Sequence, residues 1–174
     1  GAFIFEIAKS EMGYTNQPPA EYTAVILAAA VREGWSGPVF IQGDHFQVDA
    51  KNYKQDPEKE LDNIKTIILQ AIEAGFYNID IDSSTVVDLE KKDVKKQQRP
   101  NYESCAELTN FIRRHQPRGI EVSVGGEIGE VGEKNSTVED LEAFMSGFNK
   151  KLRKGRVGIS KVSIQTGTSH GGVL

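Results

Sequence analysis

Acidic and histidine side chains follow several short apolar runs of this sequence. The first group is Asp44 and His45, a carboxylate and an imidazole side by side, which suit proton transfer and metal binding. The second is Asp80 and Asp82, which share one face of a strand and are costly to bury unless paired, hydrogen-bonded or metal-bound. A capping role for Asp82 or Ser83 is the structural alternative.

Two more groups follow later apolar runs. Glu127 and Glu130 lie in the glycine-rich stretch 125–132, where glycines either let backbone approach a ligand or form a surface turn. His170 lies in the stretch 166–172, with glycine nearby on both sides. A lone histidine is usually structural. Two histidines and several carboxylates, each after a different parallel strand, instead predict a shared metal and acid/base site, because the fold brings those ends together.

The apolar runs themselves predict strands buried on both faces, since they are rich in β-branched residues and lack clean alternation. Amphipathic patterns between them predict helices. The expected strands are Ala2–Ile7, Pro38–Ile41, Tyr77–Ile81, Ile120–Val124 and Lys161–Ile164, and the expected helices are Pro19–Glu33, Pro57–Ala74, Tyr102–His115 and Thr137–Leu152. Strand and helix therefore alternate, with roughly 40 residues per unit, which implies a parallel sheet with right-handed crossovers.

Residues at the helix boundaries support this division. Ser136 followed by Glu139 predicts a capping box at the start of the last helix, and Pro57 suits a first helical turn. Gly34 and Gly75 stand where a helix should end in a left-handed residue. Each expected helix thus has a sequence reason to begin or end where it does.

Two architectures fit this order, a barrel and an open doubly wound sheet. Both place chemistry at the carboxyl ends of the strands, where the acidic and histidine groups stand. The chain begins and ends on a strand and has too few strands to close a barrel. We therefore expect residues 1–174 to form one partial domain of a larger protein, lacking its last strands and also its first.

Composition narrows the class of partner. The 174 residues are 38% hydrophobic with a formal net charge of -4, and lysines and glutamates are intermixed, which argues against nucleic acid or an anionic membrane as the main partner. No apolar run approaches the roughly 20 residues that a membrane span needs. The single cysteine, Cys105, excludes a disulfide within the chain and predicts core packing. A cytoplasmic protein acting on a small molecule is the expectation.

Two other polar features have structural interpretations. His115 ends an amphipathic helix beside Arg113 and Arg114, where it can interact with free backbone carbonyls. The charged stretch 88–99 contains four lysines and predicts either a solvated loop or a mobile flap that attracts phosphate.

The four strand-end groups, in this order, resemble the class II, metal-dependent fructose-bisphosphate and tagatose-bisphosphate aldolases. The resemblance rests on the segments Gly43-Asp44-His45, Ile81-Asp82-Ser83-Ser84, Gly126-Glu127-Ile128-Gly129 and Gly167-Thr168-Ser169-His170-Gly171. It implies a (β/α)8 TIM barrel, of which about five strands and four helices are present here. It also implies reversible cleavage of a phosphorylated ketose to dihydroxyacetone phosphate and an aldehyde.

The resemblance assigns a role to each group. Asp44 is implied as the catalytic general acid/base on the aldehyde side, and His45 and His170 as ligands of a catalytic Zn²⁺. Asp82 and Glu127 are implied to support the metal site or to hold a second divalent ion. Gly167, Ser169 and Gly171 are implied to lie near the substrate phosphate and a monovalent cation. A homo-oligomer, dimer or tetramer, is the expected assembly.

The sequence also departs from the family pattern. A third histidine ligand is expected after Leu174, so the segment alone should be inactive. Phe46 replaces a small residue after the Asp-His pair and is expected to narrow the pocket beside the metal. Gly125 replaces a glutamate and removes one inward carboxylate. Both changes predict an aldolase-like protein outside the best-known fructose-bisphosphate branch.

Two alternatives remain open. The first is an aldolase-like subunit without catalytic activity that stabilises or regulates a partner, as in the tagatose-bisphosphate system. Retention of Asp44, His45 and His170 argues against it, since a pure scaffold gains nothing from these residues. The second is another metal-dependent barrel isomerase or lyase that uses the same residues.

Overall fold

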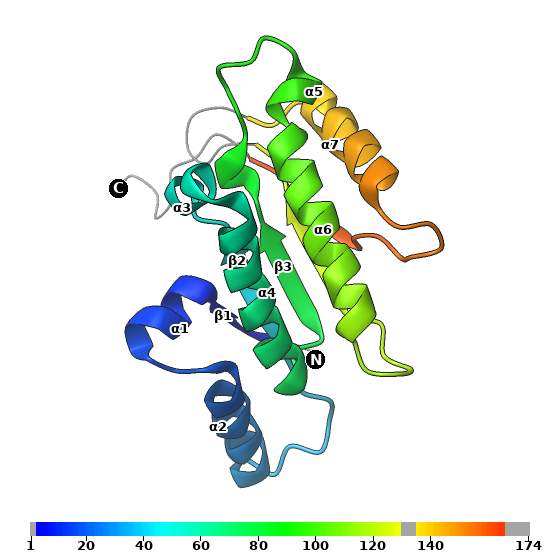
Figure 1. Ribbon diagram of the computed structural model, residues 1–174. Coiled ribbons are helices and arrows are strands. Elements are labelled where there is room, and N and C mark those ends of the chain that lie inside the picture. The colour runs from blue at the N-terminus through cyan, green and yellow to red at the C-terminus, as the bar shows by residue number, and fades with distance from the viewer. Residues whose placement is uncertain (1–2, 130–134, 166–174) are drawn as a thin grey trace.

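The computed structural model describes residues 3–129 and 135–165, which form a five-stranded parallel sheet covered by helices (Figure 1). The strands are β1 (Ile4–Ala8), β2 (Phe40–Gln47), β3 (Asn78–Asp82), β4 (Ser123–Glu127) and β5 (Lys161–Ser163). The longer helices are α2 (Pro19–Arg32), α4 (Pro57–Glu73), α6 (Arg99–His115) and α7 (Val138–Lys151). The predicted alternation of strands and helices is confirmed.

The strands lie in the order in which they occur along the chain, β1-β2-β3-β4-β5. The helices follow the same order, with α4 packed between α2 and α6, and α6 packed against α7 (Figure 1). A doubly wound sheet reverses its strand order at a switch point, and the described strands contain no such reversal. The α/β fold is therefore compatible with part of a barrel.

The hydrophobic core lies between the sheet and these helices. Ile79, Ile81 and Val124 point from the strands toward Leu108 and Ile112 of α6 and their neighbours, and all are fully or almost fully buried. The opposite face of the sheet carries polar side chains instead. The acidic side chains therefore lie on the face of the sheet that is turned away from the helices.

Two predicted strands stop too early. The strand expected to end at Ile41 continues to Gln47, and the one expected to end at Val124 continues to Glu127. Apart from Phe46, the missed residues are polar or glycine, because one face of this end of the sheet lines a polar cavity. Because the strand prediction relied on apolar runs, these residues were not recognised as part of the strands.

The helix boundaries show which local signals were reliable. Pro57 begins α4, and Gly34 and Gly75 end helices with φ of 66° and 88°, as predicted. The capping box of α7 was predicted one residue too early. It is formed by Thr137, whose hydroxyl accepts from the Asp140 N–H at 3.1 Å, while the Asp140 carboxylate accepts from the Thr137 N–H at 3.0 Å.

Several short helices were not predicted. They are α1 (Lys9–Thr15), α3 (Ala50–Gln55), the 3-10 turn η1 (Ser84–Val86) and α5 (Val94–Gln97). The charged stretch 88–99 thus contains a helical turn, begun by Asp93, whose carboxylate accepts from the Lys96 N–H at 3.0 Å. Within the described ranges, no helix has the length and apolar character needed to cross a membrane.

Arg113, in the last turn of α6, ties this helix to the sheet through backbone carbonyls. Its guanidinium donates to the carbonyls of Val122, Val157 and Gly158 at 2.6, 2.8 and 2.9 Å. Burial lowers the pKa of Arg113 from its ordinary value. Because lysine cannot reproduce this planar set of donors, the fixed fork of the guanidinium is needed here.

We expect Arg113→Lys to lower the free energy of unfolding by about 3 kcal/mol, since buried carbonyls lose their donors. The neighbouring exposed Arg114→Lys is the matched control and should stay within about 0.5 kcal/mol of the wild type. Urea denaturation monitored by circular dichroism measures both. Equal midpoints for the two variants would contradict this role of Arg113.

Cys105, on α6, is fully buried, and this burial raises the pKa of its thiol to about 12. In the unfolded chain the thiol ionises near pH 8.5. The unfolded state therefore loses a proton first, and stability must fall as pH rises from about 9 toward 12.

Cys105→Ala should remove this part of the alkaline destabilisation, which amounts to up to about 2 kcal/mol between pH 9 and pH 10.5. The measurement is the unfolding free energy of both proteins across this range. Parallel curves, offset only by the lost packing of the thiol, would show that the thiol does not contribute.

Candidate metal and acid/base site

An irregularity at the end of β2 presents Asp44 and His45 to the same cavity. The pairing of β2 with β3 shifts register between Gly43 and Phe46, and His45 has a φ of 40°. Consecutive strand residues normally point to opposite faces, and a bulge of one extra residue breaks this rule. Positive φ is uncommon for a residue with a side chain and costs of order 1 kcal/mol, so the rest of the fold must hold His45 in place.

The same bulge turns Phe46 into the core. Phe46 is fully buried, and its ring covers Gly43, where an added Cβ would lie 2.5 Å from the ring. The expectation that Phe46 narrows the pocket beside the metal is therefore wrong. Gly43 is needed because the ring packs directly against its backbone.

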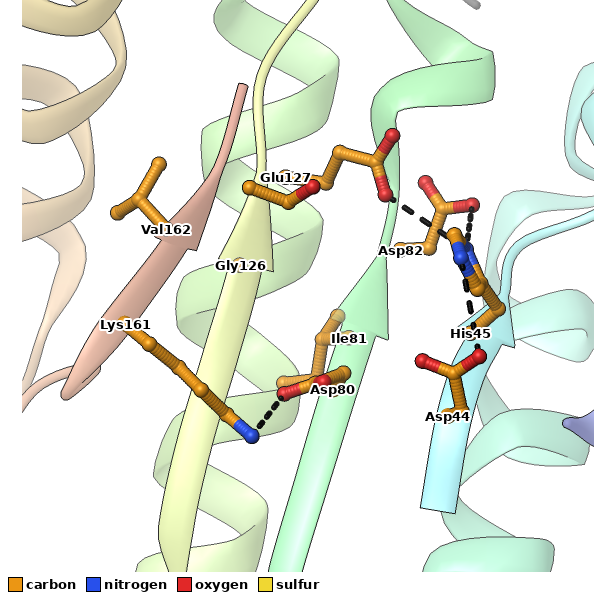
Figure 2. A pocket seen from close by; sticks show the side chains of 10 residues that line it. Asp44, His45, Asp80, Ile81, Asp82, Gly126, Glu127, Lys161 and Val162 are labelled. Atoms are coloured by element: carbon orange, nitrogen blue, oxygen red, sulfur yellow. Dashed lines mark hydrogen bonds and ion pairs between the residues drawn. The ribbon is translucent and has the colours of Figure 1, made fainter. Parts of the chain in front are cut away.

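Three donor atoms from three neighbouring strands converge at the polar end of the sheet (Figure 2). His45 Nδ1 lies 3.3 Å from Asp82 Oδ2 and 3.6 Å from Glu127 Oε2, and all three atoms lie within 4.8 Å of one another. On the other side of the imidazole, Asp44 Oδ2 lies 3.8 Å from His45 Nε2. We call His45, Asp82 and Glu127 the triad.

Asp82 divides its two oxygens between two tasks. Oδ1 accepts from the N–H and the hydroxyl of Ser84, the first residue of the 3-10 turn η1, at 3.1 and 2.7 Å. Oδ2 accepts from the side chain of Gln47 at 2.7 Å and faces His45. The N-cap residue of η1 is Ser83, which makes no side-chain cap, so Asp82 is not an N-cap, but its bonds to Ser84 orient the second oxygen toward the triad.

Asn101, in the first turn of α6, fixes the ends of β3 and β4 relative to each other. Its side-chain N–H donates to the carbonyl of Glu127 at 2.9 Å, and its side-chain oxygen accepts from the hydroxyl of Ser83 at 2.6 Å. Asn101 is fully buried. The sequence analysis missed Asn101 because the helix was expected to begin at Tyr102, one residue later. The position of Asn101 on the buried face of the helix was therefore not recognised.

The triad combines two carboxylates with a single imidazole, so the negative charges of Asp82 and Glu127 exceed the one positive charge that His45 can carry. Hydrogen bonding to Asp82 raises the pKa of His45 to about 9, with support from the charges of Asp44 and Glu127. Burial raises the pKa of Glu127 to about 7, and the charge of Asp82 adds to this. Burial also raises the pKa of Asp82, but hydrogen bonds from His45 and Ser84 outweigh it, so the pKa stays below its ordinary value.

The donor set fits a divalent cation. It offers one imidazole nitrogen and two carboxylate oxygens, ligands that suit Zn²⁺ and Mn²⁺. A divalent cation between two buried carboxylates also offsets the repulsion by Asp82 that adds to the effect of burial on the pKa of Glu127. The described residues thus provide a possible site for a divalent cation, with His45 as its one histidine among them.

Two hollows meet at Asp44, His45 and Asp82. One, of about 170 Å³, extends toward β4 and β5 and is also lined by Asp80, Glu127 and Lys161 among others. The other, of about 500 Å³, extends toward α1 and is lined by Lys9, Ser10, Glu11 and Tyr14 among others. A ligand that contacts the triad therefore has room on both sides.

The structure separates the remaining predicted residues. Asp80 shares a face with Asp82 but lies apart from the triad, paired with Lys161 at 2.9 Å (Figure 2). His115 ends its helix as predicted, with Nδ1 2.8 Å from the Phe111 carbonyl. The predicted residues Glu130, Gly167, Ser169, His170 and Gly171 lie outside the described residues.

No known family model matches this sequence, and no curated protein matches it. Among solved structures, the chain is similar to one described as a probable tagatose 6 phosphate kinase from Sinorhizobium meliloti 1021. The two are 14% identical with a TM-score of 0.64, over 97% of this chain and 44% of that one. The chain thus spans less than half the length of that protein, and the likeness shows a shared α/β fold.

Zn²⁺ titrated into the purified protein should bind at one site per chain that depends on the triad. Glu127→Gln should weaken it by more than the roughly 10- to 100-fold loss typical of outer-shell changes, because a direct ligand is lost. Glu121→Gln, an exposed glutamate near the start of β4, is the control and should bind Zn²⁺ as the wild type does. Calorimetry measures each affinity, and equal binding by both variants would remove Glu127 from the site.

Proposed function

We propose that this chain carries the metal site of a divalent-metal-dependent lyase that cleaves a phosphorylated ketose by a reversible aldol reaction. The observation that carries the proposal is the triad, three metal-binding donor atoms from three consecutive strand ends. The order of motifs that resembles the class II aldolases supports the reaction type. Catalytic and metal-binding residues at the carboxyl ends of the strands are the usual arrangement in barrel enzymes.

His45, Asp82 and Glu127 would hold the ion in this proposal. A bound Zn²⁺ supplies Lewis-acid polarisation of a ketone oxygen. Gln47 and Ser84 keep the Asp82 carboxylate oriented, and Asn101 keeps Glu127 in register with β3. The described part of the chain thus provides both the ligands and the groups that position them.

Asp44 is the proposed proton-transfer group. It lines both hollows, and its carboxylate lies 3.8 Å from His45 Nε2, on the side of the ring away from Asp82 and Glu127. In the cleavage direction, Asp44 accepts the proton of the hydroxyl next to the breaking carbon–carbon bond, and the bonding electron pair stays with the ketone fragment. In the reverse direction the same carboxyl returns the proton.

The finer parts of the proposal rest on the resemblance. They are closure into a (β/α)8 barrel, His170 as a further Zn²⁺ ligand, and a phosphate site formed by Gly167, Ser169 and Gly171. The structural neighbour is named for tagatose 6-phosphate, itself a phosphorylated ketose. That name agrees with the proposed substrate class, but at 14% identity the neighbour supports only the fold.

Asp44→Asn tests the proposed chemistry, because it keeps the shape of the side chain and removes the base. In the full-length protein we expect the rate of ketose bisphosphate cleavage to fall by about 10²- to 10⁴-fold, with Zn²⁺ content unchanged. Cleavage is followed through release of dihydroxyacetone phosphate, and metal content by elemental analysis. Loss of metal together with activity would make Asp44 a metal-site residue instead, and metal binding without any cleavage by the wild type would refute the lyase.

A further inference from the structure

Lys161, on β5, is a cavity residue that the sequence did not single out. Its side chain crosses β4 toward Asp80 of β3 (Figure 2). The ammonium lies 2.9 Å from Asp80 Oδ1 on β3 and donates to Gln42 Oε1 on β2 at 2.5 Å. A lysine on the inner face of the sheet is thus held by groups from two strands that are not its neighbours.

Gly125 makes this crossing possible. A Cβ at position 125 would lie 2.1 Å from Asp80 Oδ1 and 3.2 Å from Lys161 Cε. Any other residue would therefore push the ammonium away from Asp80. From the sequence, Gly125 was expected only to remove a carboxylate from the site. In the structure, the absence of a side chain at this position leaves room for the ammonium of Lys161.

The amide of Gln42 sets the position of the ammonium. Its nitrogen donates to Glu6 Oε2 at 3.1 Å and to Asp80 Oδ2 at 2.8 Å, so both amide hydrogens are used. The amide oxygen must then face Lys161. This network fixes the ammonium before any ligand arrives, which is the preorganisation that binding sites require.

The ammonium keeps a donor for a ligand. A lysine has three N–H donors, and within the described residues Gln42 accepts from one of them while Asp80 pairs with the ammonium as its counter-ion. The side chain is 38% exposed and lines the same hollow as the triad. It is also the single lysine or arginine among the described residues that line this hollow, which otherwise presents carboxylates.

Strand register gives the depth of the ammonium relative to the triad. Lys161 pairs with Gly125, while Glu127 pairs with Ser163, so Lys161 stands two residues deeper in the sheet. Two residues of strand correspond to about 6–7 Å. A ligand that reaches both levels must carry oxygens several carbon atoms apart, as a sugar phosphate does.

We propose that Lys161 is a substrate-binding residue that donates a hydrogen bond to an oxygen of a sugar phosphate, at a subsite below the triad. The identity of this ligand rests on the proposed function, but the subsite does not require the metal to be present. The oxygen belongs either to a sugar hydroxyl or to a phosphate group, both of which accept from an ammonium.

The test compares Asp80→Asn with the double variant Asp80→Asn/Lys161→Met in the full-length protein. Asp80→Asn removes the buried charge first, so that losing the ammonium leaves no unpaired carboxylate. Lys151→Met, an exposed lysine on α7 paired with Glu103, is the control. Calorimetry measures the affinity of each protein for fructose 1,6-bisphosphate, fructose 1-phosphate and fructose 6-phosphate, with and without Zn²⁺, and its affinity for Zn²⁺ alone.

Relative to Asp80→Asn, we expect the double variant to bind fructose 1,6-bisphosphate about 10- to 100-fold more weakly, the loss of one charge-assisted hydrogen bond. Zn²⁺ affinity and the Lys151→Met control should be unchanged. A loss confined to ligands that carry one particular phosphate identifies that phosphate as the acceptor, and an equal loss for all three identifies a hydroxyl.

Three results would overturn the subsite: equal sugar phosphate affinity in the two variants, a parallel loss of Zn²⁺ and sugar phosphate binding, or no sugar phosphate binding by the wild type. Failure of the proposed function has a different signature. A wild type that takes up no Zn²⁺ rejects the metal-dependent lyase, while the sugar phosphate titrations of the metal-free proteins still decide the role of Lys161.

Discussion

Electrostatic repulsion among inward-facing carboxylates is the constraint on which this site depends. Asp44, Asp80, Asp82 and Glu127 line one hollow of a parallel sheet, where charge is poorly solvated. Cationic side chains offset this repulsion at two depths of the hollow, which we call the deeper and the outer layer. In the deeper layer Lys161 neutralises Asp80. In the outer layer, His45 is the cationic group among the described residues that faces Asp44, Asp82 and Glu127. Its hydrogen bond to Asp82 raises the pKa of His45 to about 9, and burial together with the charge of Asp82 raises that of Glu127 to about 7. The outer layer is therefore the one that gains most from a divalent cation.

Backbone geometry decides which side chains take part in that layer. Without the bulge in β2, strict alternation would send His45 to the core if Asp44 faced the cavity. The bulge keeps both in the cavity and returns Phe46 to the core, where it packs over Gly43. The strain of a positive φ at His45 is balanced by this packing and by the contact with Asp82.

Several parts of the fold could be predicted because their causes are local. Pro57, Gly34 and Gly75 act through their own backbone preferences, and they mark the helix ends that the structure shows. A helix start was predicted less exactly where two neighbouring residues could both act as the N-cap. The capping box of α7 is formed by Thr137, whereas Ser136 was expected. Strand ends rich in polar residues were missed altogether, because hydrophobic pattern detects only the face that meets the core.

The sequence by itself determined the alternation of strands and helices and the placement of Asp44, His45, Asp82 and Glu127 toward the carboxyl ends of successive strands, since both follow from patterns a few residues long. Tertiary structure decided which atoms meet. The triad spans three strands, Lys161 reaches Gln42 over a separation of 119 residues, and Asn101 joins two strand ends from a helix. Such contacts depend on register, on the bulge and on the space left by Gly125, and these are settled only when distant segments pack together.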